Sequence, residues 1–267
     1  MTNKVNFVKE KLNSGSAALG VWSIINSPVV SEIMATAGLD FQILDMEHGV
    51  FDLSSLDASI RACESAGCSP LVRVAGLQPS SIQSALDLGA HGIVVPQVKD
   101  SLAAEETVKA MRYAPGGTRG FNPFTRAGNY AGKITAETPK LKDGFGLSSI
   151  IIESRSAYEH LDRILAIPDL DMVYLGIYDM SVALGHAGDT KHPAVAEFVE
   201  TSLPKIRKAG KSAGMMVTDL RDMSKYIDMG ANFMVFGVDT FILHDALETA
   251  VSTFAQTRLP KTNVHRS

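Results

Sequence analysis

The chain has 267 residues, of which 45% are hydrophobic and 20% charged, and its formal net charge is −4. This composition is typical of a globular protein that buries a large core, and no basic tract favours a nucleic-acid partner. Residues 1–19 lack the continuous apolar core of a signal peptide, and no apolar run reaches the roughly 20 residues that span a bilayer. We therefore expect a soluble cytoplasmic protein in which Cys63 and Cys68 stay as reduced thiols.

Eight short apolar runs recur along the chain, separated by stretches with helical periodicity. The runs are rich in Val, Ile, Leu and Met and are apolar throughout, which is typical of strands buried on both faces of a parallel sheet. The predicted strands cover residues 18–22, 41–45, 71–74, 92–95, 149–153, 172–176, 215–218 and 233–238.

Amphipathic stretches between the runs predict helices, and several of them end at a glycine, the usual stop at a helix C-terminus. The predicted helices cover residues 31–37, 53–66, 80–88, 103–112, 157–166, 194–209 and 222–228. Repeated β–α units favour a single (β/α)8 barrel of the α/β class, a TIM barrel, over an open sheet. We expect one domain over residues 1–267. No dinucleotide-binding or P-loop glycine motif follows a predicted strand.

One stretch departs from this alternation of strands and helices. Residues from Tyr113 to Gly146 are rich in Gly, Pro, Asn and Thr and predict a long irregular loop after the fourth unit. Such a loop in a compact barrel is usually functional. Its glycine-rich segment from Gly116 to Gly120, with a second arginine, could line the mouth of a site, although a simple turn explains it better. The residues after Arg258 predict a short frayed tail.

Barrel enzymes build their sites where the strands end, at the carboxyl edge of the sheet. Polar residues stand at or just after the ends of the predicted strands: Asp45, Glu47, His48, Arg73, Gln97, Glu153 and Asp179. Glu153 and Asp179 close neighbouring strands, so their carboxylates could converge on one Mg²⁺ or Mn²⁺, which prefer oxygen ligands. Acids at strand ends also cap helices or pair with arginine, and spacing alone leaves both interpretations open.

The other polar residues suggest proton transfer and anion binding. His48 stands beside Asp45 in the loop D-M-E-H-G, and a carboxylate near an imidazole can raise its basicity as a general base requires. A structural loop histidine is the alternative. Arg73 offers a planar fork that suits a carboxylate or a developing enolate oxygen. An internal salt bridge is the alternative for Arg73.

Several short motifs follow one another along the chain. They are L-G-V-W-S at Leu19, A-G-L-D-F-x-x-L-D-x-E-H ending at His48, L-V-R-V at Leu71, V-P-Q-V at Val95, R-Y-x-P-x-G-x-R-G from Arg112, I-E at Ile152, G-x-x-D-x-S from Gly176, and G-x-x-x-H-P ending at Pro193. With these motifs the chain resembles the HpcH/HpaI class II 2-keto acid aldolases from about Leu19 to about Asp239.

The resemblance implies a metal-dependent aldolase that reversibly cleaves a 4-hydroxy-2-keto acid to pyruvate and an aldehyde through a metal-stabilised enolate. It implies that Glu153 and Asp179 hold the divalent metal, which is Mg²⁺ or Mn²⁺ or else Co²⁺. It implies that Arg73 binds the keto acid and its enolate. These proteins are usually hexamers, arranged as dimers that exchange their C-terminal helices, so a homo-oligomer is expected.

The resemblance assigns the remaining roles as well. His48, helped by Asp45, is expected to manage protons through bound water, and Asp87 to support that histidine. The residues expected to bind substrate beside Arg73 are Gln97, Gly176 and Tyr178.

Two departures from the family pattern concern the substrate. Ile151 stands where the family carries glutamine, and Ile177 and Tyr178 replace a Pro-Ala pair. A bulky Tyr178 would reshape the pocket, so an enzyme that uses another enolate donor such as oxaloacetate is an alternative.

A Schiff-base aldolase would need a lysine on a strand, but the predicted strands contain none and Lys99 lies in a loop. A non-catalytic barrel is a further alternative, but it would need no converging polar groups.

Overall fold

Eight parallel strands form a closed barrel in sequence order, in a computed structural model that describes residues 5–130 and 143–257. The strands are β1 (Ala18–Ser23), β2 (Phe41–Asp45), β3 (Ser69–Arg73), β4 (Gly92–Val95), β5 (Leu147–Ile152), β6 (Met172–Leu175), β7 (Ser212–Val217) and β8 (Phe233–Val238). The predicted (β/α)8 barrel is therefore confirmed. Its extent over residues 1–267 as one domain stays a prediction.

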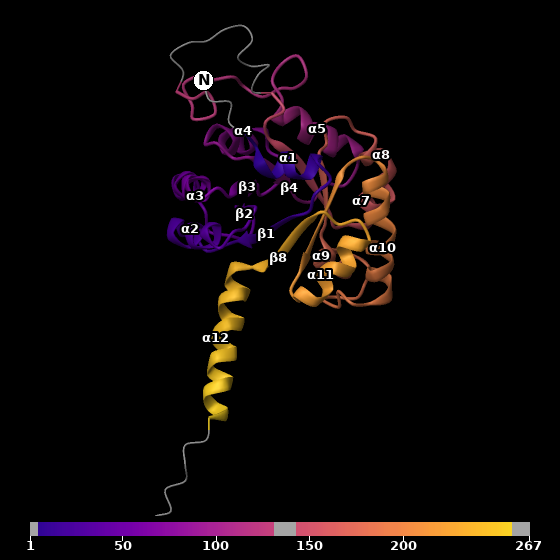
Figure 1. Cartoon of the computed structure of the whole chain (residues 1–267). Helices are drawn as coiled ribbons and strands as arrows, with labels where there is room; N and C mark the ends of the chain where they lie inside the picture. The colour runs from indigo at the N-terminus through magenta and orange to yellow at the C-terminus, as the bar shows by residue number, and fades with distance from the viewer. Residues whose placement is uncertain (1–4, 131–142, 258–267) are drawn as a thin grey trace, which may run out of the picture.

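Helices surround the barrel (Figure 1). They are α1 (Phe7–Asn13), α2 (Pro28–Thr36), α3 (Leu53–Ser65), α4 (Pro79–Asp87), α5 (Ser101–Met111), α7 (Arg155–Glu159), α8 (Leu161–Leu165), α9 (Ile177–Ala183), α10 (Pro193–Lys208), α11 (Met223–Asp228) and α12 (Asp239–Gln256). No helix in the described ranges is long and apolar enough to cross a membrane. The cytoplasmic location stays a prediction.

Burial on both faces explains why the strands are apolar without alternation. Within β5, Ile151 faces a cluster inside the barrel, where Phe41 and Phe233 stack with ring centroids 3.9 Å apart. Its neighbours Ile150 and Ile152 belong to the second cluster, between the strands and the helices. Successive residues of a strand point to opposite faces, so each strand needs apolar residues at consecutive positions.

The predicted helices differ from the observed ones mainly at their ends. The helix α2 starts three residues before the predicted range, because Ser27 caps it and Pro28 suits a first helical position. The predicted helix over 157–166 is two short helices, α7 and α8, that meet at His160. The helices α1, α9 and α12 were not predicted from periodicity.

The described parts of the long irregular loop, residues 113–130 and 143–146, lie at the end of the barrel where the strands begin, so the glycine-rich segment does not line the mouth of the site. The loop joins the end of α5 to the start of β5, and helices in this fold return the chain to the amino end of the next strand. Arg119 pairs there with Asp87 at 2.7 Å, and its guanidinium carbon lies 4.7 Å from the Tyr113 ring centre. The segment from Gly116 to Gly120 is therefore a turn packed near α4 and α5. Residues 131–142 of this loop lie outside the described residues.

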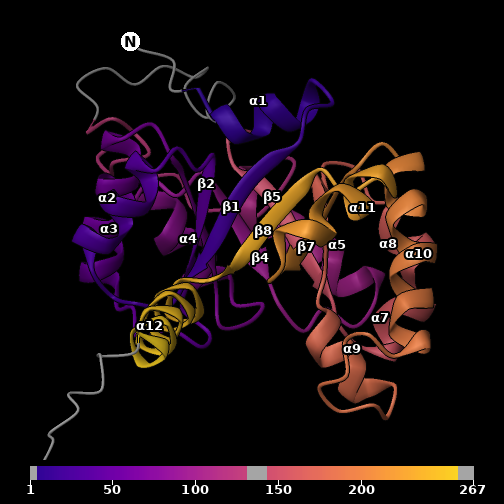
Figure 2. The same cartoon turned by 60° about the horizontal axis from the view of Figure 1, so that its bottom comes forward.

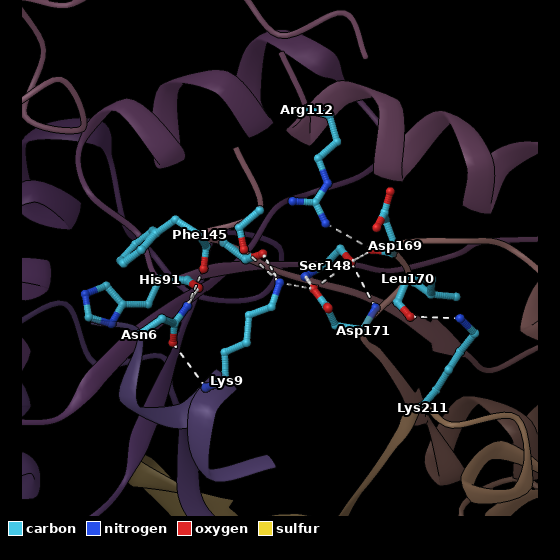
Figure 3. Close-up of polar contacts among 12 residues, drawn as sticks. Asn6, Lys9, His91, Arg112, Phe145, Ser148, Asp169, Leu170, Asp171 and Lys211 are labelled. Atoms are coloured by element: carbon cyan, nitrogen blue, oxygen red, sulfur yellow. Dashed lines mark hydrogen bonds and ion pairs between the residues drawn. The ribbon is translucent and has the colours of Figure 1, made fainter. Parts of the chain in front are cut away.

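Helix α1 covers this amino end through a polar network (Figure 3). Lys9 Nζ lies 2.8 Å from an Asp171 carboxylate oxygen and donates to the carbonyls of Gly144 and Gly146 at 2.9 and 3.2 Å. Asp171 also accepts the backbone N–H of Ser148, on β5, at 2.8 Å. These contacts join α1 to the starts of β5 and β6. Helix α1 does not cover the opposite end of the barrel, where the strands end, so a site can form there.

Helix α12 leaves the barrel from that opposite end, where α9 also lies (Figure 2). The carboxylate of Asp239, its first residue, accepts backbone N–H groups of Ile24 and Ile25 at 3.1 and 3.0 Å. The same carboxylate accepts the hydroxyl of Ser23 at 3.1 Å. Asp239 therefore ties the start of α12 to the end of β1.

Candidate active site

A cavity of about 280 Å³ opens at the carboxyl ends of the strands. Most of the predicted site residues line it, namely Asp45, His48, Arg73, Glu153, Gly176, Tyr178 and Asp179. They come from the ends of β2, β3 and β5 or the loops directly after them, from the junction of β6 and α9, and from the first turn of α9. Strand-end position alone was enough to bring these residues together, because parallel strands present all their carboxyl ends at one rim.

Glu153 follows the last residue of β5 and is only partly exposed. Its Oε1 accepts the backbone N–H of Gln97. Burial raises the pKa of Glu153 to about 7, and the negative charges of Asp179 and Glu47 add to this effect. The N–H of Gln97 and the positive charge of Arg73 lower the same pKa but do not outweigh burial.

Asp179 lies in the first turn of α9, directly after the strand that pairs with β5. It lines the same cavity as Glu153, and its charge raises the pKa of Glu153, so the two carboxylates lie within electrostatic reach. In the described ranges neither carboxylate forms an ion pair with a basic side chain. A divalent cation would relieve the repulsion between these carboxylates and displace the proton that the raised pKa retains. The donor set therefore fits Mg²⁺ or Mn²⁺.

Gly176 leaves the space that Glu153 occupies. A Cβ placed on Gly176 would lie 2.7 Å from the Cβ of Glu153 and 2.9 Å from Cγ2 of Ile151. Both distances are shorter than a carbon–carbon contact allows, so any side chain at this position would displace Glu153 from its present place.

We expect the substitution Gly176→Ala to lower kcat/KM by about a hundredfold, because a shift of about 1 Å in a positioned group has that order of effect. Circular dichroism should show an unchanged fold, since Gly176 has a φ of −83° that alanine adopts readily. The matched control is Gly210→Ala, at a site without a neighbour within 4 Å but with a positive φ of 76°. Strain at Gly210 should lower the melting temperature and leave kcat/KM unchanged. Equal effects of both substitutions on kcat/KM would contradict the role of Gly176.

Arg73 is held at the end of β3 by acids on two sides. Its Nε donates to Oδ1 of Asp45 at 2.8 Å, and its Nη2 bonds the second oxygen of the same carboxylate. Its Nη1 lies 3.2 Å from Oε2 of Glu47. Burial alone would lower the pKa of Arg73, but the hydrogen bonds and charge of Asp45 outweigh it and raise that pKa. The internal salt bridge considered from the sequence is present, and the side chain also lines the cavity.

The structure gives Asp45 a different task from the predicted support of the His48 imidazole. Its buried carboxylate accepts the backbone N–H groups of Glu47 and His48 at 2.9 and 3.2 Å, besides the bonds from Arg73. His48 itself is exposed and lines the cavity. Across residues 5–130 and 143–257, no hydrogen bond or ion pair joins the imidazole of His48 to Asp45. Asp45 therefore shapes the loop and orients Arg73.

The structure does not bring Asp87 to His48 within one chain, and the predicted support of His48 by Asp87 stays a prediction. Asp87 is the last residue of α4 and lies at the amino end of the barrel, where its carboxylate pairs with Arg119 at 2.7 Å. Helices run antiparallel to the strands in this fold, so a helix C-terminus lies at the end of the barrel away from His48.

Gln97 does not line the cavity wall but organises the acids beside it. Its backbone N–H holds Glu153, and its side-chain Nε2 donates to Oε1 of Glu47 at 2.9 Å. Its φ of +57° lies in the left-handed region, which aims this N–H at the carboxylate. Glu47 was noted in the sequence but not assigned a role, and it bridges Gln97 and Arg73.

Two aromatic residues of the cavity were not predicted. Trp22 stands near the end of β1, and Tyr174 lies within β6 and faces the barrel interior. Both belong to apolar runs that the sequence explains as core. Only the position of Trp22 near a strand end distinguishes it from other core residues.

Comparisons with known proteins agree with this site. The profile of the HpcH/HpaI aldolase/citrate lyase family matches residues 18–246. The hydroxypyruvate/pyruvate aldolase of Roseovarius nubinhibens is 34% identical over 97% of this chain and 99% of its own length. The 2-keto-3-deoxy-L-rhamnonate aldolase of Escherichia coli K12 is 33% identical over 93% of each chain.

Solved structures show the same relationship. The HpcH/HpaI aldolase from Desulfitobacterium hafniense superposes with a TM-score of 0.89, at 29% identity over 96% of this chain and 99% of that one. The citrate synthase SbnG superposes with a TM-score of 0.85, at 29% identity over 94% and 98%. The chain therefore belongs to the HpcH/HpaI aldolase/citrate lyase family.

Proposed function

We propose that this protein is a divalent-metal-dependent aldolase that reversibly cleaves a 4-hydroxy-2-keto acid to pyruvate and an aldehyde. The observation that carries the proposal is one cavity in which Glu153 and Asp179 form no ion pair with any basic residue of the described ranges and lie beside a fixed Arg73. Relatives named as aldolases for hydroxypyruvate/pyruvate and 2-keto-3-deoxy-L-rhamnonate support it.

The metal would rest on Glu153 and Asp179. In the described part of the chain, no group of three or more His, Cys, Asp and Glu side chains is arranged to bind a metal. Two carboxylates suffice for Mg²⁺ or Mn²⁺, with Co²⁺ as a substitute, because such ions retain waters or take substrate oxygens. When bound, the cation supplies Lewis-acid chemistry at the keto group and neutralises developing negative charge.

The side chains of the cavity perform the remaining tasks. Arg73 offers its fork to the oxygens of the keto acid, and its charge stabilises the enolate of pyruvate that forms as the C3–C4 bond breaks. Asp45 holds that fork still, so little reorganisation is needed during the reaction. His48 is the histidine of the cavity and accepts the proton of the 4-hydroxyl group, directly or through water.

One experiment tests the activity itself. The purified protein should release pyruvate from 4-hydroxy-2-keto acids in the presence of Mg²⁺ or Mn²⁺, measured with a coupled lactate dehydrogenase assay. Treatment with a chelator should abolish turnover, and added metal should restore it. Full activity in excess chelator would overturn the proposal.

Use of a different enolate donor is the second candidate function. The fold resemblance to a citrate synthase and the exposed Tyr178 at the cavity favour testing it. Oxaloacetate offered with a panel of ketone and aldehyde acceptors, followed by mass spectrometry of the products, separates this activity from pyruvate aldol chemistry.

We also propose that α12 docks on a second copy of the chain in a homo-oligomer. The apolar residues Leu243, Leu247, Val251 and Phe254 are spaced at i, i+4, i+8 and i+11, so they share one face of the helix, and each is more than half exposed. Helix α12 points away from its own barrel (Figure 1). An exposed stripe of this kind marks an interface. The predicted hexamer is one assembly that would cover it.

The substitution Val251→Asp is expected to shift the protein towards monomer in sedimentation velocity, because it places a charge within the apolar stripe that the second copy would cover. The matched control is Ser252→Asp on another face of the same helix, which should leave the sedimentation coefficient unchanged. An identical oligomer in both variants would contradict docking through this face.

A further inference from the structure

Trp22 is the chain's single tryptophan and contacts two other residues of the cavity, Arg73 and Tyr174. Above its ring face, the guanidinium carbon of Arg73 stands 4.3 Å from the ring centre. At its edge, the indole Nε1 donates a hydrogen bond to the hydroxyl of Tyr174 at 3.0 Å. The three residues therefore form a continuous chain of contacts, which we call the Tyr174–Trp22–Arg73 stack.

The hydrogen bond in this stack crosses the barrel interior. Trp22 belongs to β1 and Tyr174 to β6, and these strands are not neighbours in the closed sheet. The two rings meet edge-on, at a centroid distance of 5.5 Å and an angle of 87°. Trp22 and Tyr174 are 5% and 4% exposed, so bulk water does not replace the bond. An indole has one N–H, in the plane of its ring, so a bond to a fixed acceptor sets the orientation of the ring.

The orientation of Trp22 matters to Arg73, because a guanidinium stacks parallel to an aromatic face and gains cation–π attraction there. Asp45 fixes one edge of the guanidinium through Nε and Nη2. The edge contact leaves rotation about the line between Arg73 and Asp45 open, and two further contacts restrict it, the ion pair of Nη1 with Glu47 and the face of Trp22. The Tyr174 hydroxyl in turn keeps that face in place.

We infer that Tyr174 is a positioning residue of this enzyme, which sets the plane of the Arg73 guanidinium through a hydrogen bond to Trp22. The inference rests on the proposed function only in taking Arg73 as the group that receives the keto acid. A phenylalanine at 174 would fill the same space in the core but would leave the buried indole N–H without its acceptor. Burial raises the pKa of the Tyr174 phenol, so the hydroxyl remains neutral and available as an acceptor.

The hydrogen bond can be removed from either side. Tyr174→Phe deletes the acceptor, and Trp22→Phe deletes the donor while keeping an aromatic face. Affinity for pyruvate in the presence of Mn²⁺ is measured by calorimetry, and kcat/KM for cleavage by the coupled assay. Tyr174→Phe is expected to weaken pyruvate binding and lower kcat/KM by about fivefold to tenfold, the effect of one neutral hydrogen bond.

A double-mutant cycle tests whether Tyr174 acts through Trp22. In the Trp22→Phe background, Tyr174→Phe should change pyruvate affinity and kcat/KM by less than twofold, because the bond has already gone. Multiplicative effects in the double variant would overturn the inference. If Tyr174→Phe fails to fold, Trp22→Phe still tests it, because a loss of less than twofold in that variant would also overturn it.

Fluorescence of Trp22 reports directly whether its hydrogen bond to Tyr174 is lost. Excitation at the red edge of the indole band, where tyrosine does not absorb, selects the single tryptophan, so Tyr174→Phe should shift the emission of the ligand-free protein to shorter wavelength, as the excited indole loses its acceptor. The control Tyr158→Phe, in a tyrosine that packs on Phe198 outside the cavity, should leave emission unchanged. An emission shift without a change in pyruvate affinity would overturn the positioning role. A wild-type protein that binds pyruvate but cleaves no 4-hydroxy-2-keto acid would refute the proposed aldolase reaction and leave this inference standing.

Discussion

The substitution Glu153→Gln is expected to lower kcat/KM for keto acid cleavage by about a thousandfold or more, the order seen when a preorganised electrostatic contact to the transition state is removed. Glutamine retains the shape of the side chain and an oxygen that can accept the N–H of Gln97. It lacks the negative charge that a divalent cation needs. The fold should therefore persist while the metal site is lost, and steady-state kinetics at saturating Mg²⁺ measures the effect.

Two comparisons make this result specific. Glu159→Gln removes the same charge from an exposed position on α7 and should leave kcat/KM unchanged. The melting temperature of Glu153→Gln should equal or exceed that of the wild type, because burial raises the pKa of Glu153 above its unfolded value. A carboxyl group with a raised folded-state pKa destabilises the fold as pH increases from about 4.5 to about 7, and glutamine does not titrate. Activity within tenfold of the wild type would contradict the assignment of Glu153 as a ligand.

The substitution Arg73→Lys should lower kcat/KM by about a hundredfold to a thousandfold, although it preserves the charge. An ammonium group cannot bond both oxygens of Asp45 and still present a second edge to the substrate, as the guanidinium does. It also lacks the flat face that lies over Trp22. Both KM for the keto acid and kcat should worsen if Arg73 contacts the substrate before the reaction and the enolate during it, as we propose.

The matched control for this prediction is Arg61→Lys. Arg61 pairs with Asp57 at 2.9 Å on the surface of α3, where an exposed ion pair contributes little. Its kinetic constants should match those of the wild type. Retention of more than a tenth of wild-type kcat/KM by Arg73→Lys would show that Arg73 supplies charge alone and that its fork is not needed.

The barrel and the place of Glu153 and Asp179 at its rim were predictable from the sequence for one physical reason. Strands buried on both faces must be apolar at consecutive positions, so the charged residue that ends each run marks the rim of the barrel. Glu153 and Arg73 follow this rule. Asp179 lies in the first turn of α9, a helix that periodicity did not reveal.

Differences between the expected and the observed site arose where sequence position does not determine which end of the barrel or which atom is involved. Asp87, the last residue of α4, and the described parts of the loop after α5 lie at the amino end, because helices return the chain to that end of the barrel. Asp45 is adjacent to His48 in the loop, but its carboxylate is occupied by backbone N–H groups and by Arg73. Adjacency in sequence therefore did not reveal the partner of the carboxylate.

The Tyr174–Trp22–Arg73 stack shows a further limit of prediction from sequence. Its members lie on β1, β3 and β6, and contacts across a barrel interior depend on the closure and register of the sheet. A tyrosine within an apolar run looks like any other core residue until its neighbours across the barrel are known.

The central claim is that Glu153 and Asp179 together bind a divalent cation beside Arg73, and Mn²⁺ binding tests it most directly. Electron paramagnetic resonance counts free Mn²⁺ during titration of the wild type, Glu153→Gln and Asp179→Asn, without dependence on any substrate. The account predicts one Mn²⁺ per wild-type chain and an affinity at least about a hundredfold weaker in each variant. Unchanged Mn²⁺ binding in either variant would contradict it.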